Sequence, residues 1–277
     1  MVICFAAGND ARKPVGPLYR GHIGAQAAAK NCITVGASRS SRDPHDWNPD
    51  AVADTSSRGP IHRGRCKPDV VAPEAPNLVQ RAKQLDSDGN WCFMSGTSIA
   101  TPLVAGCAAV LREALTSSYQ GISSSAALIK ALLINGADIL NPTTPNFVPS
   151  NHSGYGRVNI ANTIAVVHGD PGTGFRMDKV SDDTPRWLET IQVVPGYTTL
   201  KVTLVWSDPP GETLKNRLGL EVWDDTGPKF ARNNNTVQQV VRSTISPGDA
   251  SLRVGIISYN RRLEKSPQPF AVVWRFY

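Results

Sequence analysis

The sequence predicts an α/β part followed by an all-β antiparallel sandwich or jelly roll. An apolar, alanine-rich run from Ile99 to Leu111 indicates a helix in the first part. Alternating apolar residues in the second part, beginning with Leu200–Trp206, indicate half-buried strands. A segment rich in glycine, Gly169–Gly174, lies between them and reads as a linker. We therefore expect domains at residues 1–168 and 175–277.

The helix over 99–111 should be buried, because nearly all its residues are apolar. Gly96 permits a tight turn before it, and Pro102 is tolerated only in the first helical turn. This places Ser98 at the helix N-terminus, where free N–H groups and the helix dipole favour negative charge. A second helix should follow the cap Ser123–Ser125, and the proline-containing segment 141–151 should be a loop.

In the second part, the alternation of Leu200–Trp206 recurs at three later places. Turn-forming segments rich in proline and glycine separate the repeats. Six or more short strands over about 100 residues are typical of a sandwich or jelly roll. The further repeats are at 218–222, 252–256 and 270–274.

Composition excludes several classes of protein. The chain has 277 residues, 40% hydrophobic and 19% charged, which is ordinary for a soluble protein with a sizeable core. It lacks an unbroken run of about 18 apolar residues, so we predict no transmembrane helix and no membrane partner. The net charge of +6 is spread thinly, which predicts no nucleic-acid partner. The five cysteines match no zinc or disulfide spacing.

The segment Met94–Pro102 reads Met-Ser-Gly-Thr-Ser-Ile-Ala-Thr-Pro. It resembles the nucleophile segment of subtilisin-like serine proteases, which implies that Ser98 is the catalytic serine. The segment Val2–Asp10 resembles the family's strand ending in Ala-Ala-Gly-Asn, which implies that Asn9 stabilises the oxyanion. The same two motifs imply a substrate-binding role for their neighbours Ala7, Gly8, Gly96 and Thr97.

Further blocks resemble the same family in the same order. We interpret them as scaffold and groove walls, although Glu74 stands where the family has glycine. The resemblance covers about residues 1–168 and implies a parallel sheet of which this chain carries only the later strands. These blocks are 29–37, 56–60, 67–73 and the closing segment 154–162.

The family's aspartate motif and His-Gly-Thr-His motif occur nowhere in the sequence. A serine hydroxyl needs a general base, which an acid orients. None of the five histidines lies in a motif that would bring it to the serine. We therefore expect a fragment, a truncated product or an inactive relative, and an N-terminal complementing segment as one partner. The histidines are His22, His45, His62, His152 and His168.

The second part resembles the jelly-roll domain behind the catalytic domain of alkaline subtilases, on Leu204–Gly211 and on Asn216-x-Leu218-x-Leu220. Some members bind calcium there, with aspartates where this chain has Arg217 and Gly219. Calcium prefers several oxygen ligands, so we predict no cofactor and disfavour calcium at this motif. The remaining candidate carboxylates are Asp182, Asp183, Asp224 and Asp225.

The resemblance thus implies a serine endopeptidase that hydrolyses proteins or peptides through an acyl-enzyme. The missing motifs favour a competing hypothesis, an inactive pseudoprotease or fragment that acts as a binding or regulatory module. The family suggests secretion, and two glycosylation-like triplets, at Asn151 and Asn234, agree with it. The opening Met1–Ala7 is too short for a signal peptide, so the compartment stays open.

Overall fold

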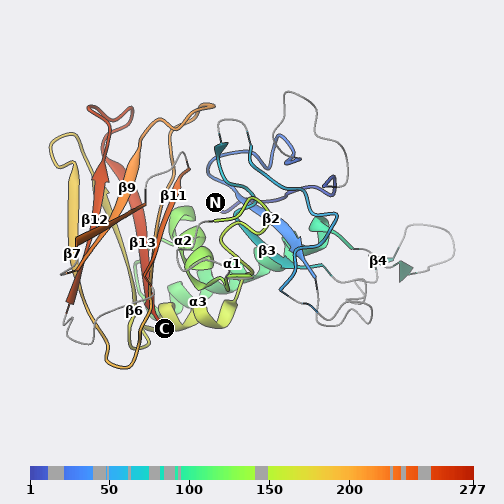
Figure 1. Cartoon of the computed structure of the whole chain (residues 1–277), viewed down its shortest axis with the longest axis horizontal. Coiled ribbons are helices and arrows are strands. Elements are labelled where there is room, and N and C mark those ends of the chain that lie inside the picture. Colours follow the sequence, from blue (N-terminus) through green and yellow to red (C-terminus); the bar gives the residue numbers. More distant parts are fainter. Residues whose placement is uncertain are drawn as a thin grey trace.

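The computed structural model has an α/β part and a β-sandwich, with helices between the parallel sheet and the sandwich (Figure 1). This confirms the fold class expected from the sequence. The structure describes residues 1–11, 22–39, 48, 50–61, 64–74, 82–83, 91–92, 95–140, 149–224, 227–231, 235–242 and 251–277.

The first part contains a parallel sheet in the order β1-β2-β3. Its strands are β1 (Cys4–Ala6), β2 (Ile33–Ser38) and β3 (Val70–Pro73). Every residue of β2 is buried, as expected for a central parallel strand covered on both faces. Two short strands, β4 (Ala82–Lys83) and β5 (Trp91–Cys92), form a separate antiparallel pair.

Three helices follow: α1 (Thr97–Ser118), α2 (Ala126–Gly136) and α3 (Ile160–His168). Ser125 caps α2 by accepting a hydrogen bond from the Leu128 N–H at 3.1 Å, which confirms the predicted cap. The side chain of Asn159 caps α3 in the same way.

Two expectations for α1 were wrong. Pro102 lies in the second turn rather than the first, because the helix begins at Thr97. Its ring nitrogen has no hydrogen to donate to the carbonyl of Ser98. The helix is also buried on one side only, since Ala105, Ala109 and Val110 are exposed. An apolar sequence does not tell which sides of a helix will be covered.

On length and hydropathy alone, α1 is also apolar enough to cross a membrane, with 33% of its most apolar window buried. Its buried side packs in the core against the parallel sheet and α2. Such a helix also occurs in the core of soluble proteins. The expected absence of a membrane span therefore stays a prediction.

The second part consists of two four-stranded antiparallel sheets, in the orders β11-β8-β13-β6 and β10-β9-β12-β7. Their facing sides enclose a core that includes Leu204, Trp206, Leu220 and Ile256. The strands are β6 (Thr173–Val180), β7 (Arg186–Gln192), β8 (Leu200–Trp206), β9 (Leu218–Asp224), β10 (Gly227–Ala231), β11 (Val237–Arg242), β12 (Ser251–Ser258) and β13 (Gln268–Phe276).

The two parts are not independent, because α2 packs on the outer face of the β11-β8-β13-β6 sheet. The Asn135 amide donates to the carbonyls of Lys201 and Val273, both at 3.1 Å. The core cluster of the helices also includes Val205 and Val273 of the sandwich. Strand β8 is therefore buried on both faces, not on one as predicted, and β6 begins at Thr173 inside the predicted linker.

Lys201 is a buried cation at this contact. It is 1% exposed, and its Nζ donates to the carbonyl of Ala137 at the end of α2 at 2.8 Å. Burial, together with the nearby Arg275, lowers the pKa of Lys201 to about 7, and Asp138 opposes part of this shift. The ring of Tyr277 also lies 5.6 Å from Nζ.

We expect the stability of the chain to rise with pH between about 7 and 10 through this lysine. The unfolded chain holds the Lys201 proton up to about pH 10, whereas the folded chain releases it near 7. Unfolding therefore takes up a proton in this window, which favours the folded state as pH rises. The urea midpoint of the native chain should therefore rise with pH relative to that of Lys201→Met. The exposed Lys179→Met is the control; equal slopes for all three chains would contradict the expectation.

Candidate functional site

Asn9 and the start of α1 lie side by side, although 88 residues separate Asn9 from Thr97. The Asn9 Oδ1 accepts hydrogen bonds from the Thr97 N–H and from its hydroxyl, each at 3.0 Å. The same hydroxyl oxygen accepts the N–H of Gly8 at 3.2 Å. Because the oxygen of the Asn9 amide is engaged in this way, its Nδ2 group is the end left to donate to a ligand.

Ser98 is the second residue of α1 and its side chain is exposed. Backbone N–H groups of the first helical turn have no partner within the helix, and the helix dipole makes this end positive. A negative charge that forms beside Ser98 would therefore be stabilised by the helix. The exposed hydroxyl, the free helical N–H and the neighbouring Asn9 together suit attack on a carbonyl group.

Gly96 allows Asn9 to approach this closely. Its φ is 105°, in the region that favours glycine, and a Cβ at this position would lie 2.8 Å from Asn9 Nδ2 and 2.9 Å from Oδ1. Glycine at this point is therefore required by both the backbone and the neighbouring amide.

We expect Gly96→Ala to displace the Asn9 amide and to reduce reaction at Ser98 by about 10²–10³-fold, the usual cost of losing one oxyanion donor. The strained φ should also destabilise the chain by about 1–3 kcal/mol. Labelling of Ser98 by a serine-reactive probe, in the presence of a segment that supplies the catalytic aspartate and histidine, measures the first effect, and urea unfolding of the chain measures the second. Gly106→Ala, at an α1 position with open space, is the control; equal labelling of both variants would contradict this role.

The four expected substrate-binding residues surround this contact, but they differ in exposure. Ala7 and Thr97 are 0% exposed and Gly96 is buried, so the side chains of Ala7 and Thr97 are not accessible to a peptide in this structure. Gly8 is half-buried, and its carbonyl accepts the N–H of Ser57 at 2.8 Å. Thr97 and Gly96 thus position Asn9 in this structure. The predicted substrate contacts of all four residues stay predictions.

Residues that the sequence motifs assigned to scaffold support the turn at Asn9. The Ser57 hydroxyl accepts the N–H of Asp10 at 3.1 Å, and the Ser56 hydroxyl accepts that of Ala37 on β2 at 3.0 Å. Together they attach the turn after β1 to the sheet. Sequence reasoning missed these roles, as it missed the Thr97 hydroxyl, because each depends on a distant partner.

A buried ionic cluster links the residue before β3, Asp69, to α2. Asp69 accepts Lys67 Nζ at 2.5 Å and faces Lys130 Nζ at 2.9 Å, and all three side chains are at most 2% exposed. Burial alone would raise the pKa of Asp69, but Lys130, Lys67 and the N–H of Thr34 outweigh it and hold that pKa below its usual value. No sequence motif links Lys130 to Lys67 and Asp69.

None of the three described histidines is hydrogen-bonded to Ser98 in the described part of the chain. The backbone N–H of His22 donates to the carbonyl of Arg58, and His168 ends α3. Burial and the neighbouring Arg58 lower the pKa of His152. His45 and His62 lie outside the described residues.

The jelly-roll motif considered for calcium is occupied by protein contacts. The Asn216 amide donates to Gln268 Oε1 at 2.8 Å, and its oxygen accepts the N–H of Glu264 at 2.9 Å. The ring of Tyr259 fills the space beside Gly219. Within the described residues no three His, Cys, Asp or Glu side chains gather in a group that could hold a metal. Asp225 lies outside them, and the expected lack of a metal stays a prediction.

Comparison of the chain with known proteins identifies its family. The family model described as the subtilase family matches residues 1–156. Serine protease AprX of Bacillus subtilis is 34% identical over 173 residues, covering 59% of this chain and 35% of AprX. The serine protease/ABC transporter B family protein tagD of Dictyostelium discoideum is 30% identical over 234 residues, covering 63% of this chain and 13% of tagD.

Among solved structures, tripeptidyl peptidase 2 is similar at a TM-score of 0.36 and 13% identity, covering 98% of this chain and 32% of that protein. The chain thus spans about a third or less of the length of these relatives. The family match extends over more than half of the chain and includes Asn9 and Ser98. The chain therefore belongs to the subtilase family of serine proteases.

Proposed function

We propose that this chain supplies the nucleophile and the oxyanion-binding half of a subtilisin-like endopeptidase site. Ser98 would attack the carbonyl carbon of a peptide bond and form an acyl-enzyme. The observation that carries the proposal is the Asn9 amide, fixed through its oxygen to Thr97, directly before Ser98. Membership of a serine protease family supports the same reading.

In this mechanism the oxyanion of the tetrahedral intermediate accepts hydrogen bonds from Asn9 Nδ2 and from the backbone N–H of Ser98. Both donors are fixed before the reaction, so they need no reorganisation when charge develops. The proton of the Ser98 hydroxyl passes to a histidine base and then to the leaving amine. The substrates are proteins or peptides that reach the exposed Ser98.

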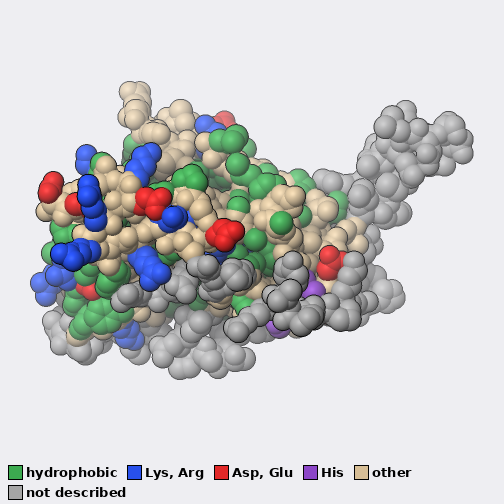
Figure 2. Space-filling model, turned by 90° about the horizontal axis from the view of Figure 1, so that it is seen from above, with side chains coloured by type: hydrophobic (Ala, Val, Ile, Leu, Met, Phe, Trp, Pro, Cys, Tyr) green, Lys and Arg blue, Asp and Glu red, His purple; other side chains and the backbone are tan. Residues whose placement is uncertain are grey.

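We propose that the catalytic aspartate and histidine come from an N-terminal complementing segment, joined to this chain or associated with it. We place its docking surface at the edge of β1 that pairs with no strand in the described part of the chain, together with the side of α1 that the described residues leave exposed. Ile3 is 42% exposed and Val110 48% exposed, and an open strand edge presents unpaired backbone groups. Figure 2 shows hydrophobic side chains exposed over the middle of the molecule, while Lys and Arg gather on the β-sandwich.

A secreted location is part of the proposal. One relative, 36% identical over 116 residues, is named minor extracellular protease Vpr of Bacillus subtilis, and this chain covers 14% of it. Its name supports an extracellular site of action for the assembled enzyme.

A fluorophosphonate probe tests the function. The chain is treated with the probe alone and after addition of a subtilase segment that carries the aspartate and histidine motifs. We expect negligible labelling alone and stoichiometric labelling at Ser98 in the complemented sample. Failure to label in a complex shown to form by size exclusion would favour the competing function, a non-catalytic binding module.

A further inference from the structure

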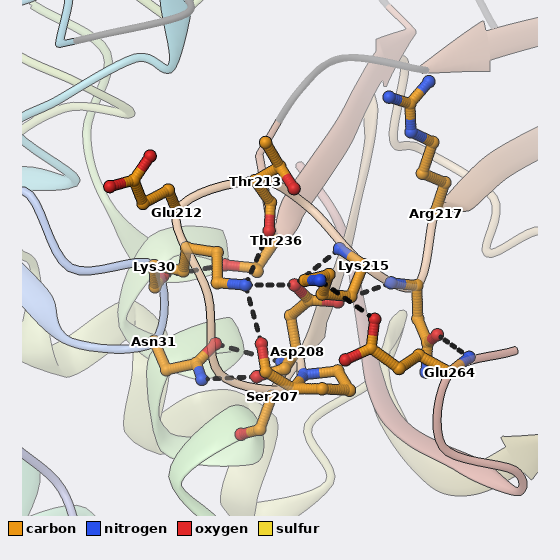
Figure 3. Close-up of polar contacts among 12 residues, drawn as sticks. Lys30, Asn31, Ser207, Asp208, Glu212, Thr213, Lys215, Arg217, Thr236 and Glu264 are labelled. Atoms are coloured by element: carbon orange, nitrogen blue, oxygen red, sulfur yellow. Dashed lines mark hydrogen bonds and ion pairs between the residues drawn. The ribbon is translucent and has the colours of Figure 1, made fainter.

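The loop that follows β8 encloses the side chain of a lysine from the subtilase part (Figure 3). Nζ of Lys30 donates to Asp208 Oδ2 at 2.5 Å, to the carbonyl of Pro209 at 2.7 Å and to that of Thr213 at 2.8 Å. The side chains of Lys30 and Asp208 are 6% and 0% exposed. A primary ammonium has three donors, and the loop offers one acceptor for each.

The loop holds its carboxylate in place through its own backbone. Asp208 Oδ1 accepts the N–H of Asn216 at 2.7 Å, and Oδ2 accepts that of Lys215 at 2.9 Å. The indole of Trp206 donates to the carbonyl of Asn216 at 3.0 Å. These contacts lie within the sandwich, so the Asp208 carboxylate is held in place without help from the lysine.

A second set of contacts fixes the backbone beside the lysine. Asn31 Nδ2 donates to the carbonyl of Asp208 at 2.8 Å, while Asn31 Oδ1 accepts the N–H of Asp208 at 3.0 Å. The Thr236 hydroxyl, just before β11, donates to the carbonyl of Lys30 at 3.0 Å. The sandwich thus binds both the side chains and the backbone of the short segment Lys30–Asn31, as Figure 3 shows.

We propose that the Ser207–Lys215 loop is a binding site for a primary ammonium group, and that capture of Lys30 in it holds the β-sandwich on the subtilase part. The acceptors suit an ammonium better than calcium, which takes six to eight oxygen ligands. A guanidinium is planar and wider, and its fork of donors does not match acceptors gathered around one nitrogen.

Lys30→Ala tests the site, because it removes the propylammonium portion of the side chain and leaves Asp208 buried without its cation. We expect the melting temperature of the 277-residue chain to fall by roughly 5–15 °C, since a buried charge that loses its partner is costly. Propylammonium chloride should then restore the melting temperature in a saturable manner, because it binds only the folded state.

Four controls distinguish an ammonium site from a general effect of salt or mutation. Tetramethylammonium chloride carries the charge without N–H donors, propanol lacks the charge, and neither should restore stability. Lys30→Ala/Asp208→Ala should not respond to propylammonium. Lys179→Ala removes an exposed lysine on β6, outside the loop, and should shift melting little.

The proposal is wrong if Lys30→Ala melts like Lys179→Ala, or if propylammonium, propanol and tetramethylammonium restore its melting temperature equally. Rescue by calcium chloride but not by propylammonium would make the loop a metal site instead. If Lys30→Ala does not fold, Lys30→Met, which keeps the apolar stem, takes its place. Its melting temperature must then fall well below that of Lys179→Met, and an equal value would overturn the proposal.

Discussion

Replacing Ser98 by alanine should lower the turnover of the complemented protease by about 10⁶-fold, the loss measured when subtilisin loses its serine. The two neighbouring hydroxyls of α1 are already engaged: that of Thr97 donates to Asn9 Oδ1 at 3.0 Å, and that of Thr101 donates to the carbonyl of Thr97 at 2.7 Å. Steady-state hydrolysis of a chromogenic peptide by the chain joined to an aspartate- and histidine-bearing segment measures the effect.

Two variants give this result its controls. Ser118→Ala changes an exposed serine at the other end of α1 and should leave turnover unchanged. Asn9→Ala removes one oxyanion donor and should cost about 10²–10³-fold, mainly in kcat. Full activity of the Ser98→Ala enzyme would remove the basis of the proposed chemistry, whatever the family of the chain.

The sequence was sufficient for elements whose signals are local. Ser125 correctly predicts the start of α2, and the alternating apolar residues correctly locate β12 and β13. Strand β13 is nevertheless buried on both faces, as β8 is, because α2 covers its outer side. Strands β6 and β7 were missed, because they lie at the sheet edges and carry polar residues such as Arg176 and Glu189 on both faces. Alternation weakens where a strand has no fully buried side.

The candidate site likewise has one part that local motifs predict and another that depends on distant contacts. Ser98 and Asn9 could be named because their motifs are contiguous, but the contacts that position them depend on long-range packing. The Thr97 hydroxyl meets Gly8 across 89 residues, and Lys30 meets Asp208 across 178. Composition also predicted a fully buried α1, because it does not tell which helix side faces the rest of the fold.

Asp69→Asn should destabilise the chain by about 3–5 kcal/mol, the second large effect that we expect. The Asp69 carboxylate lies between the ammonium groups of Lys67 and Lys130, and its Oδ2 also accepts the N–H of Thr34 at 2.8 Å. An asparagine offers one acceptor oxygen and turns an N–H₂ group toward the other lysine. The variant would thus leave two buried cations without a counter-charge.

Urea unfolding at pH 7 measures the loss, with Asp54→Asn as the control, since Asp54 is 53% exposed in a 3.2 Å pair with Arg39. Because the folded-state pKa of Asp69 is depressed, its contribution should be present above about pH 4 and lost as pH falls through the folded-state pKa. The native chain and Asp69→Asn should therefore become alike in strong acid. Lys130→Met added to Asp69→Asn should recover part of the stability by removing one unpaired cation; no recovery would mean that packing, not charge, dominates this cluster.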